Sequence, residues 1–318
     1  MSPVLARMLT RLGPGLGLLL VVAIFGSLVP ESFLTLGNFR TIAAQTVIPA
    51  LCALGMTFVI GSGGIDLSAG SQVALAAVVC AYGMRAGFGE TISCGLAMLA
   101  TTACGFVNGA LITTLRVVPF IVTLGMLGIA RGLAKWISGE QKIDAPAGWL
   151  SSFMAKSPEP AWLLVAPGVW MLGLLALVLG LVLRRTTFGL HAIAIGSSEA
   201  TARLCGVPVD RRKIQLYMLL GALCGLAGCM SFGRLTVGDP TTAVGLELHV
   251  IAAVVIGGGS LSGGECSIFG AVVGALVMYS LQSGCNQAGV PTYVQEIVIG
   301  AIIIAAVAID RFRGKLIG

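Results

Sequence analysis

Charge is what this chain lacks most. Asp, Glu, Lys and Arg make up only 10% of its 318 residues, whereas 57% are hydrophobic and the mean hydropathy is +0.99. A domain that dissolves in water needs far more charge on its surface. The composition therefore excludes an ordinary soluble domain and indicates a protein whose solvent is mostly lipid.

The motifs of several enzyme classes are also absent. The chain has two histidines, His191 and His249, and neither an HExxH motif nor a plausible Ser/His/Asp set, so an intramembrane enzyme would lack its catalytic residues. It has no GxxxxGK[ST] phosphate loop, so any ATP that its function consumes must be hydrolysed by another chain. The longest hydrophilic stretches, 138–159 and 184–213, are no longer than loops. We therefore interpret 1–318 as a single transmembrane domain that needs no cofactor.

Cysteine and charge patterns exclude two further classes of site. The nine cysteines include no CxxC pair, and Cys52, Cys80, Cys94, Cys104, Cys224 and Cys229 lie within apolar runs. A thiol in such a run behaves as a small hydrophobic group, so we predict neither disulfides nor a metal site. The net charge of +6 does not indicate nucleic acid, because the basic residues lie in the breaks between apolar runs, where membrane topology needs them.

What the chain has instead is a series of long apolar runs. Seven spans carry no ionised side chain: 12–30, 41–65, 67–84, 91–115, 160–183, 214–233 and 266–295. At about 1.5 Å per residue, each is long enough to cross a hydrocarbon core of roughly 30 Å as a helix. Gly-x-x-x-Gly spacings, which let membrane helices approach closely, occur at Gly105/Gly109, Gly128/Gly132, Gly221/Gly225 and Gly270/Gly274. The pattern predicts an all-α polytopic membrane protein.

The runs and their breaks predict about ten transmembrane helices. Their spans are Pro14–Val29, Ile42–Ile60, Ser71–Met84, Thr91–Thr114, Pro119–Ile137, Trp162–Leu183, Ile214–Ser231, Leu246–Ile256, Ser267–Cys285 and Tyr293–Ile309. An even number places both termini on one side. That side, with the 184–213 loop, then carries twelve of the 19 basic residues and the other side seven, so we expect it to face the cytoplasm. The first span has no convincing cleavage site, so we expect a retained helix rather than a secretory signal.

A short internal sequence repeat predicts two ordered helix breaks. Gly63-Gly-Ile-Asp-Leu-Ser-Ala-Gly70 aligns with Gly257-Gly-Gly-Ser-Leu-Ser-Gly-Gly264, 194 residues later, with five of eight positions identical. In lipid, a broken helix leaves backbone groups unpaired unless protein or a watery cavity satisfies them. The two breaks therefore suggest a lined cavity, as in transporters with discontinuous helices. Six predicted crossings separate them, so either the repeat is parallel or the likeness is local.

A few polar residues interrupt the apolar helices and are candidates for a translocation pathway. Asp66 is the acid most deeply embedded in apolar sequence; it either contacts solute or a gate, or it caps the helix that starts near Leu67. The same alternatives hold for the aligned Ser260 and for the matching pair Ser68 and Ser262. The remaining candidates, for which hydrogen bonding within the bundle is the alternative, are Asn108 and Glu296. Arg131 and Lys135, one turn apart near an interface, are expected to snorkel.

The 184–213 loop contains the pattern of a short helix. After Gly196, Ser197 can cap a helix, Glu199 suits its first turn and Arg203 its last, and Gly206 ends it. A helix of about eight residues is too short to be stable alone in water, so it must dock on something through a face that carries Ala200 and Leu204. Its partner is either the membrane-facing body of this protein or a groove on a cytoplasmic protein.

At these segments the chain resembles a known family. The matching stretches begin with Ala53-Leu-Gly-Met-Thr-Phe-Val-Ile60 running into Gly63-Gly-Ile-Asp-Leu-Ser68, and Thr123-Leu-Gly-Met-Leu-Gly-Ile-Ala-Arg-Gly132. They continue with Ala202-Arg-Leu-Cys-Gly-Val207, the stretch 251–264, and Gln295-Glu-Ile-Val-Ile-Gly300 through Asp310-Arg311. Together they resemble the membrane permeases of bacterial ABC sugar importers, of the ribose/xylose/galactose type, which are related to the branched-chain amino-acid permeases.

The resemblance implies a function and partners. It implies a ten-helix permease of the bacterial inner membrane that moves a monosaccharide by alternating access, paired with a second copy or a close relative. It also implies a cytoplasmic ATPase, a periplasmic or extracellular sugar-binding protein, and a segment from Gly196 to Gly206 that couples to the ATPase. The alternative is an ion-coupled secondary transporter of a small polar solute, with Asp66 or Glu296 as its ion site.

Overall fold

The structure is a computed structural model in which almost every element is a helix. It describes residues 3–146, 148–156, 158 and 161–317, and no side chains at 1–12, 161, 306–307 or 309–318. Several terminal basic residues of the charge count, Arg7, Arg11, Arg311, Arg313 and Lys315, have side chains outside that description. The helices are α1 (Pro3–Leu28), α2 (Pro30–Phe33), α3 (Leu36–Gly61), α4 (Ala69–Arg85), α5 (Glu90–Leu115), α6 (Pro119–Ser138), α7 (Trp149–Phe153), η1 (Ala161–Leu163), α8 (Pro167–Arg185), α9 (Thr187–Ser197), α10 (Glu199–Leu204), α11 (Val209–Leu235), α12 (Leu246–Ile256), α13 (Ile268–Gln287) and α14 (Thr292–Ile317).

The predicted apolar runs coincide with these helices. Among the described residues, six helices are long and apolar enough to cross a membrane: α3, α5, α6, α8, α11 and α13. Shorter apolar helices cover 13–28, α9, α12 and 292–305. The all-α polytopic class agrees with this finding, whereas a total of ten crossings stays a prediction. The span expected from Trp162 is corrected, because α8 begins only at Pro167, whose fixed φ suits the first helical position.

Two buried helices, α3 and α11, form the centre of the bundle. Most of α3 from Ile42 to Gly61 is buried, and α11 is buried over most of its apolar length. The Gly-x-x-x-Gly pairs of α5 and α11 both lie at the contact between these two helices. A Cβ on Gly105 would meet the backbone of Tyr217, and one on Gly221 would meet the carbonyl of Thr101. This close backbone approach replaces the hydrophobic driving force that lipid removes. The pair on α6, Gly128/Gly132, has open space around it and makes no such contact.

Two non-helical segments connect elements of the bundle. The first, residues 62–68, joins α3 to α4. The second, residues 239–245, follows the short strand β2 (Val237–Gly238), which pairs antiparallel with β1 (Ile143–Asp144), and leads into α12. It runs along α4, because Gly238 lies against Ala81 and the carbonyl of Ala243 lies against Gly70. Helix α12 therefore begins inside the bundle, and its eleven residues are too few to span it alone.

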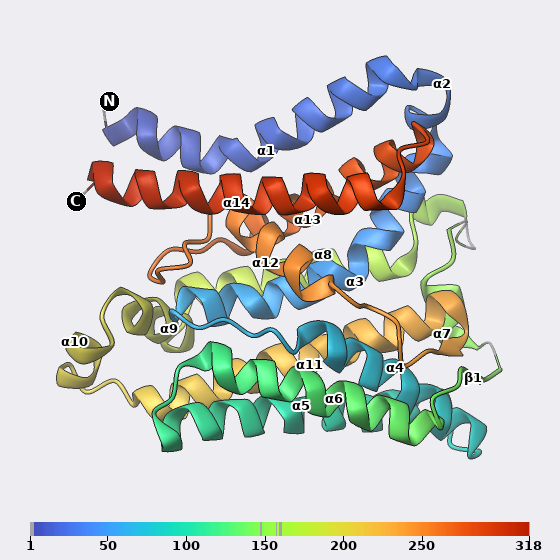
Figure 1. Ribbon diagram of the computed structural model, residues 1–318, viewed down its shortest axis with the longest axis horizontal. Coiled ribbons are helices and arrows are strands. Elements are labelled where there is room, and N and C mark those ends of the chain that lie inside the picture. The colour runs from blue at the N-terminus through green and yellow to red at the C-terminus, as the bar shows by residue number, and fades with distance from the viewer. Residues whose placement is uncertain (1–2, 147, 157, 159–160, 318) are drawn as a thin grey trace.

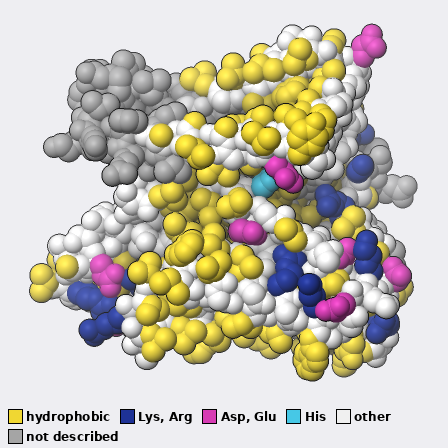
Figure 2. Space-filling model, in the orientation of Figure 1, with side chains coloured by type: hydrophobic (Ala, Val, Ile, Leu, Met, Phe, Trp, Pro, Cys, Tyr) yellow, Lys and Arg dark blue, Asp and Glu magenta, His cyan; other side chains and the backbone are white. Residues whose placement is uncertain are grey.

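The long helices run roughly along the long axis of the molecule (Figure 1). The start of α1, the end of α14, and helices α9 and α10 all lie at one end, whereas β1 and α7 lie at the other (Figure 1). On the face shown in Figure 2, hydrophobic side chains cover much of the middle, and basic side chains gather near α10 and on the opposite half. The placement of the termini beside α10 is the arrangement that an even number of crossings requires.

Candidate functional site

The first break carries a buried polar cluster, which we call the Asp66 cluster: Asp66, Ser68, Gln72 and Asn108. All four side chains are fully buried. One carboxylate oxygen of Asp66 accepts hydrogen bonds from the backbone and the hydroxyl of Ser68, and the other accepts from Asn108 Nδ2 at 3.1 Å. Gln72 Nε2 donates to Ser68 Oγ at 2.8 Å. The cluster thus ties the break and the start of α4 to α5.

The geometry corrects one expectation for Asp66. It does not cap the N-terminus of α4, because the N-cap residue is Ser68 and that side chain makes no capping bond. Asp66 instead closes the preceding turn by accepting from the backbone two residues ahead, at 2.7 Å. A buried carboxylate needs strong hydrogen bonds to offset desolvation, and here three donors supply them.

Several polar atoms around the cluster have no hydrogen-bond partner in the described structure. Gln72 had not been singled out from the sequence, although a glutamine inside an apolar run is a visible signal. The phenol oxygen of Tyr217, on α11, lies where a Cβ of Gly64 would be, so it faces the first break. Buried polar atoms normally find a partner, so these four atoms are exceptions. They are Ser71 Oγ, Gln72 Oε1, Asn108 Oδ1 and Tyr217 Oη.

The second break repeats the turn of the first in a more open setting. Ser260 Oγ accepts from the backbone of Ser262 at 3.3 Å, as Asp66 accepts from Ser68. Ser260 is half-buried and Ser262 is exposed. The cap of the next helix, α13, is Ser267, so the capping role expected for Ser260 is also corrected. Glu296 is exposed on α14 and therefore does not belong to the buried Asp66 cluster.

Both breaks meet α9 at a contact rich in glycine, which we call the glycine junction: Gly61, Gly63, Gly196, Gly263 and Gly264. The amide of Gly264 donates to the carbonyl of Gly61 at 3.0 Å. A Cβ on Gly196 would collide with both of those groups, and one on Gly263 would collide with Gly196. Three backbone segments that are far apart in the chain therefore touch directly (Figure 1).

The predicted short helix exists, with different bounds. Ser197 is the last residue of α9, and its hydroxyl donates back to Ile193. The capping residue is Ser198, whose Oγ accepts from the amide of Thr201 at 3.2 Å. Helix α10 is thus six residues long, and the loop expected over 184–213 consists largely of α9, α10 and the start of α11. The cap moves by one residue because Ser198, unlike Ser197, is in the extended conformation that capping requires.

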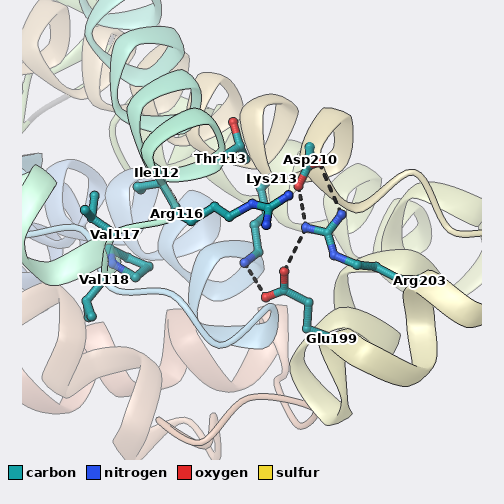
Figure 3. Close-up of a pocket in the computed structure, with 10 residues that line it drawn as sticks. Ile112, Thr113, Arg116, Val117, Val118, Glu199, Arg203, Asp210 and Lys213 are labelled. Carbon is teal, nitrogen blue, oxygen red and sulfur yellow. Dashed lines mark hydrogen bonds and ion pairs between the residues drawn. The ribbon is translucent and has the colours of Figure 1, made fainter.

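Four charged side chains fix α10 to the start of α11, and we call them the ionic cluster: Glu199, Arg203, Asp210 and Lys213 (Figure 3). Arg203 donates to Glu199 at 2.9 Å and to Asp210, and Lys213 donates to Glu199 at 2.6 Å. Partial burial alone would raise the pKa of Glu199, but the hydrogen bonds from Lys213 and Arg203 outweigh it and hold that pKa below its ordinary value. The cluster is therefore ionised at neutral pH.

The outer face of α10 remains uncovered. Ala202 is buried and packs toward Ile195 and Val209, whereas Ala200 is exposed and Leu204 is 88% exposed. Beside the ionic cluster lies a cavity of about 510 Å³, whose other wall is the α5–α6 connection at 116–118. Arg116 extends from that connection toward Asp210 and Lys213 (Figure 3). The surface around α10 thus combines an exposed leucine with a charged, concave neighbour.

Arg131 has a different role from the expected one. Its Nη1 donates to the carbonyls of Pro240 and Thr242, both at 2.7 Å, so it holds the segment 239–245 in place instead of snorkelling. Next to it, Asp239 accepts from Lys142 at 3.2 Å and from the amide of Thr241. The end opposite α10 is therefore also braced by charged side chains.

Comparison with known proteins places these features in a family context. Residues 38–307 match the family model described as branched-chain amino acid transport system / permease component. The chain is 36% identical to the L-arabinose ABC transporter permease protein AraH of Azospirillum brasilense, over 96% of this chain and 89% of that protein. It is 36% identical to the ribose import permease protein RbsC of Escherichia coli K12, over 93% of this chain and 92% of that protein. For the D-allose transport system permease protein AlsC of the same strain the identity is 36%, over 94% and 90%. No solved structure gives a significant match.

Proposed function

This chain belongs to the family of branched-chain amino acid transport system permease components, and we propose that it is the permease subunit of an ATP-binding cassette importer for a monosaccharide. The observation that carries the proposal is its similarity, over more than nine-tenths of the chain, to permeases named for L-arabinose, ribose and D-allose. All three solutes are small, polyhydroxylated sugars. Such a solute needs a lined path, because its hydroxyl groups cannot enter lipid unpaired.

The exposed face of α10 is the proposed docking surface for the ATPase. A helix of six residues is held in place by its cap Ser198, the ionic cluster and the packing of Ala202, so its uncovered side, with Ala200 and Leu204, is free to contact a partner. The ATPase is a separate chain and sits in the cytoplasm. The end that carries α10 and both termini therefore faces the cytoplasm of a bacterial inner membrane, in agreement with the excess of basic residues predicted there.

The glycine junction offers a route from the docking surface to the pathway. Movement of α9 and α10 displaces Gly196, and Gly196 is in backbone contact with both breaks. The first break carries the Asp66 cluster, whose unpartnered oxygens and amide groups suit a solute hydroxyl. We place Asp66, Ser68 and Asn108 along the pathway, with Ser260, Ser262 and Glu296 as further candidates. A chain of direct contacts with two arrangements is what such coupling requires.

The remaining partners follow from the same proposal. A sugar-binding protein delivers solute at the end that carries β1 and α7, and a second copy of this chain or a close relative completes the pathway. Lipid surrounds the apolar exterior seen in Figure 2. The permease alone holds sugar only weakly, because tight contacts would trap the solute before release.

Reconstitution tests the proposal. The chain is placed in lipid vesicles with its ATPase and binding protein, and uptake of labelled ribose, L-arabinose and D-allose is measured. We expect uptake of at least one sugar that needs ATP on the α10 side and the binding protein on the other. A sodium or proton gradient without the ATPase serves as the control. Uptake driven by the gradient alone would contradict the proposal and support the ion-coupled alternative.

A further inference from the structure

Three thiols that the transport function does not use lie together inside the bundle. Cys80 on α4, Cys94 on α5 and Cys229 on α11 have their sulfur atoms within 4.8 Å of one another. The sulfurs of Cys80 and Cys94 are 3.9 Å apart. We call these residues the thiol cluster, and we propose that it binds one soft, thiophilic divalent cation of the zinc, cadmium or mercury class.

The spacing of the sulfurs suits such an ion. Metal–thiolate bonds are about 2.3 Å long, so three sulfurs around one ion are about 3.8–4.0 Å apart in tetrahedral or trigonal geometry. The separation of 3.9 Å between the Cys80 and Cys94 sulfurs falls in that range, and the Cys229 sulfur lies within 4.8 Å of both. The same distance is far too long for a disulfide, whose formation would also need an oxidant and would leave the third thiol unused. Thiolate sulfur selects soft cations over magnesium or calcium.

The backbone holds the three thiols in place before any ion arrives. Gly83 of α4 lies against Ser93, the neighbour of Cys94, and Gly228, the neighbour of Cys229, lies against Val73 and Ala76 of α4. Each contact is so close that a Cβ on the glycine would collide. Three helices locked by such contacts cannot easily separate the sulfurs, and a metal site benefits from ligands fixed by rigid elements.

A second, independent feature lies beside the cluster. Glu90 is four residues before Cys94 on α5, so both side chains are on the same face of that helix. One of its carboxylate oxygens accepts from the amide of Trp149 at 2.7 Å, and the other is buried without a partner among the described residues. Helix α5 begins at Glu90, one turn before Cys94, so its carboxylate adds negative charge near the thiol cluster that favours an approaching cation.

The charge balance of the bound state fixes its form. Each thiol that binds the ion does so as a thiolate, and its proton leaves as the metal–sulfur bond forms. Three thiolates around one divalent ion therefore form a site with one net negative charge, and three protons are released. Cys80 and Cys229 are buried and Cys94 is half-buried, which leaves Cys94 as the point of access.

Occupation of the cluster has a consequence that rests on the proposed function. The ion would join α4, which follows the first break, to α11, which begins in the ionic cluster. If transport requires these helices to move relative to each other, a bound ion holds them together and inhibits uptake. Binding itself does not depend on transport, so failure of one claim can be told from failure of the other.

Cadmium titration of the purified full chain, reduced and in detergent, tests the site directly. Cys205→Ser, which removes the exposed thiol of α10, serves as the parent. We expect a saturable thiolate-to-cadmium charge-transfer band at one ion per chain. Cys94→Ala should weaken binding by about 10-fold or more, whereas Cys224→Ala, which alters the buried Cys52–Cys224 pair on α3 and α11, should leave it unchanged.

A second measurement guards against variants that fail to fold. The cadmium-113 chemical shift of the parent protein reports the number of sulfur ligands without any change to the cluster. We expect a shift typical of three sulfurs. A shift typical of one or two sulfurs, the absence of a one-to-one band, or a band that survives Cys94→Ala would overturn the proposal.

Discussion

The two glycine-rich breaks have five of eight aligned residues in common and form the same turn, but different interactions hold them in place. At the first break, Asp66 joins the turn to Asn108 on α5 through fully buried side chains. At the second, Ser260 closes the same turn, and the loop up to Ser267 is half-buried or exposed. The first break is therefore fixed by hydrogen bonds between buried side chains, and the second lies where water can replace a lost bond.

The same local motif can therefore form a rigid loop in one place and an adaptable loop in another. A hydrogen bond in a dry interior is costly to lose, because its partners remain unsatisfied, whereas an exposed one is worth little. Since the glycine junction contacts both breaks, we infer that a movement of α9 displaces the second break more easily than the first.

Asp66→Ala should have the largest effect. It leaves the amide and the hydroxyl of Ser68 without their acceptor, at about 1–3 kcal/mol for each buried group. It also removes one of the two acceptors of Asn108 Nδ2, which keeps its bond to Ser68 Oγ. We expect the free energy of unfolding to fall by about 3 kcal/mol or more, and the melting temperature in detergent to fall with it. Asp66→Asn, which keeps an acceptor oxygen, should recover part of the loss. A wild-type melting temperature for Asp66→Ala would show that the first break is not fixed as described.

Gly196→Ala tests the glycine junction. The added methyl group collides with the Gly61 carbonyl and the Gly264 amide, and such overpacking costs about 1–3 kcal/mol. We expect ATP-driven uptake to be largely lost, with the α10 surface still able to bind the ATPase. Gly128→Ala, on an open face of α6, is the matched control and should transport normally. Normal uptake by Gly196→Ala would remove the junction from the coupling route.

Ser68→Ala and Ser262→Ala are a matched pair at aligned positions of the two breaks. Ser68 is fully buried and bonded to Asp66 and Gln72, so we expect its loss to cost about 1–2 kcal/mol. Ser262 is exposed, and its loss should stay within about 0.5 kcal/mol. Thermal or denaturant unfolding of the two variants measures the difference. Equal losses would contradict the contrast between the breaks.

Glu199→Gln should have only a small effect on stability, about 0.5 kcal/mol, because its ion pairs are partly exposed. The folded protein holds the pKa of Glu199 below its ordinary value of 4.5, so the contribution of its carboxylate is present above that value. It is lost as pH falls through the lowered pKa. We expect binding of the ATPase to the wild-type chain to weaken at acid pH, and binding to Glu199→Gln to show a smaller pH dependence. Identical pH profiles would exclude this role of Glu199.

The sequence indicates the helices well, because a charge-free run in lipid has few alternatives to a helix. The sequence also predicts the short helix before Gly206. Whether Ser197 or Ser198 caps that helix depends on one backbone conformation, which the sequence does not indicate. The role of Asp66 was open for a physical reason: its partner Asn108 is 42 residues away, on a helix whose rotation no local pattern determines.

Other features were missed because they arise only from packing. The segment 239–245 carries no distinctive motif. The two carbonyls that Arg131 binds lie more than 100 residues further along the chain. The cysteines were interpreted as small hydrophobic residues, and no spacing indicates that Cys80, Cys94 and Cys229 converge. In each case helices bring together residues whose separation in the chain has no pattern.

Labelling of Cys205 tests the central claim, that α10 faces the cytoplasm and contacts the ATPase. Cys205 is the exposed thiol among the nine cysteines, all within the described residues, and it directly follows α10. A membrane-impermeant maleimide is applied to intact spheroplasts and to inverted membrane vesicles, with Cys205→Ser as the background. We expect labelling only in inverted vesicles, and several-fold slower labelling when the ATPase is added. Labelling of intact spheroplasts, or a rate that the ATPase does not change, would contradict the account.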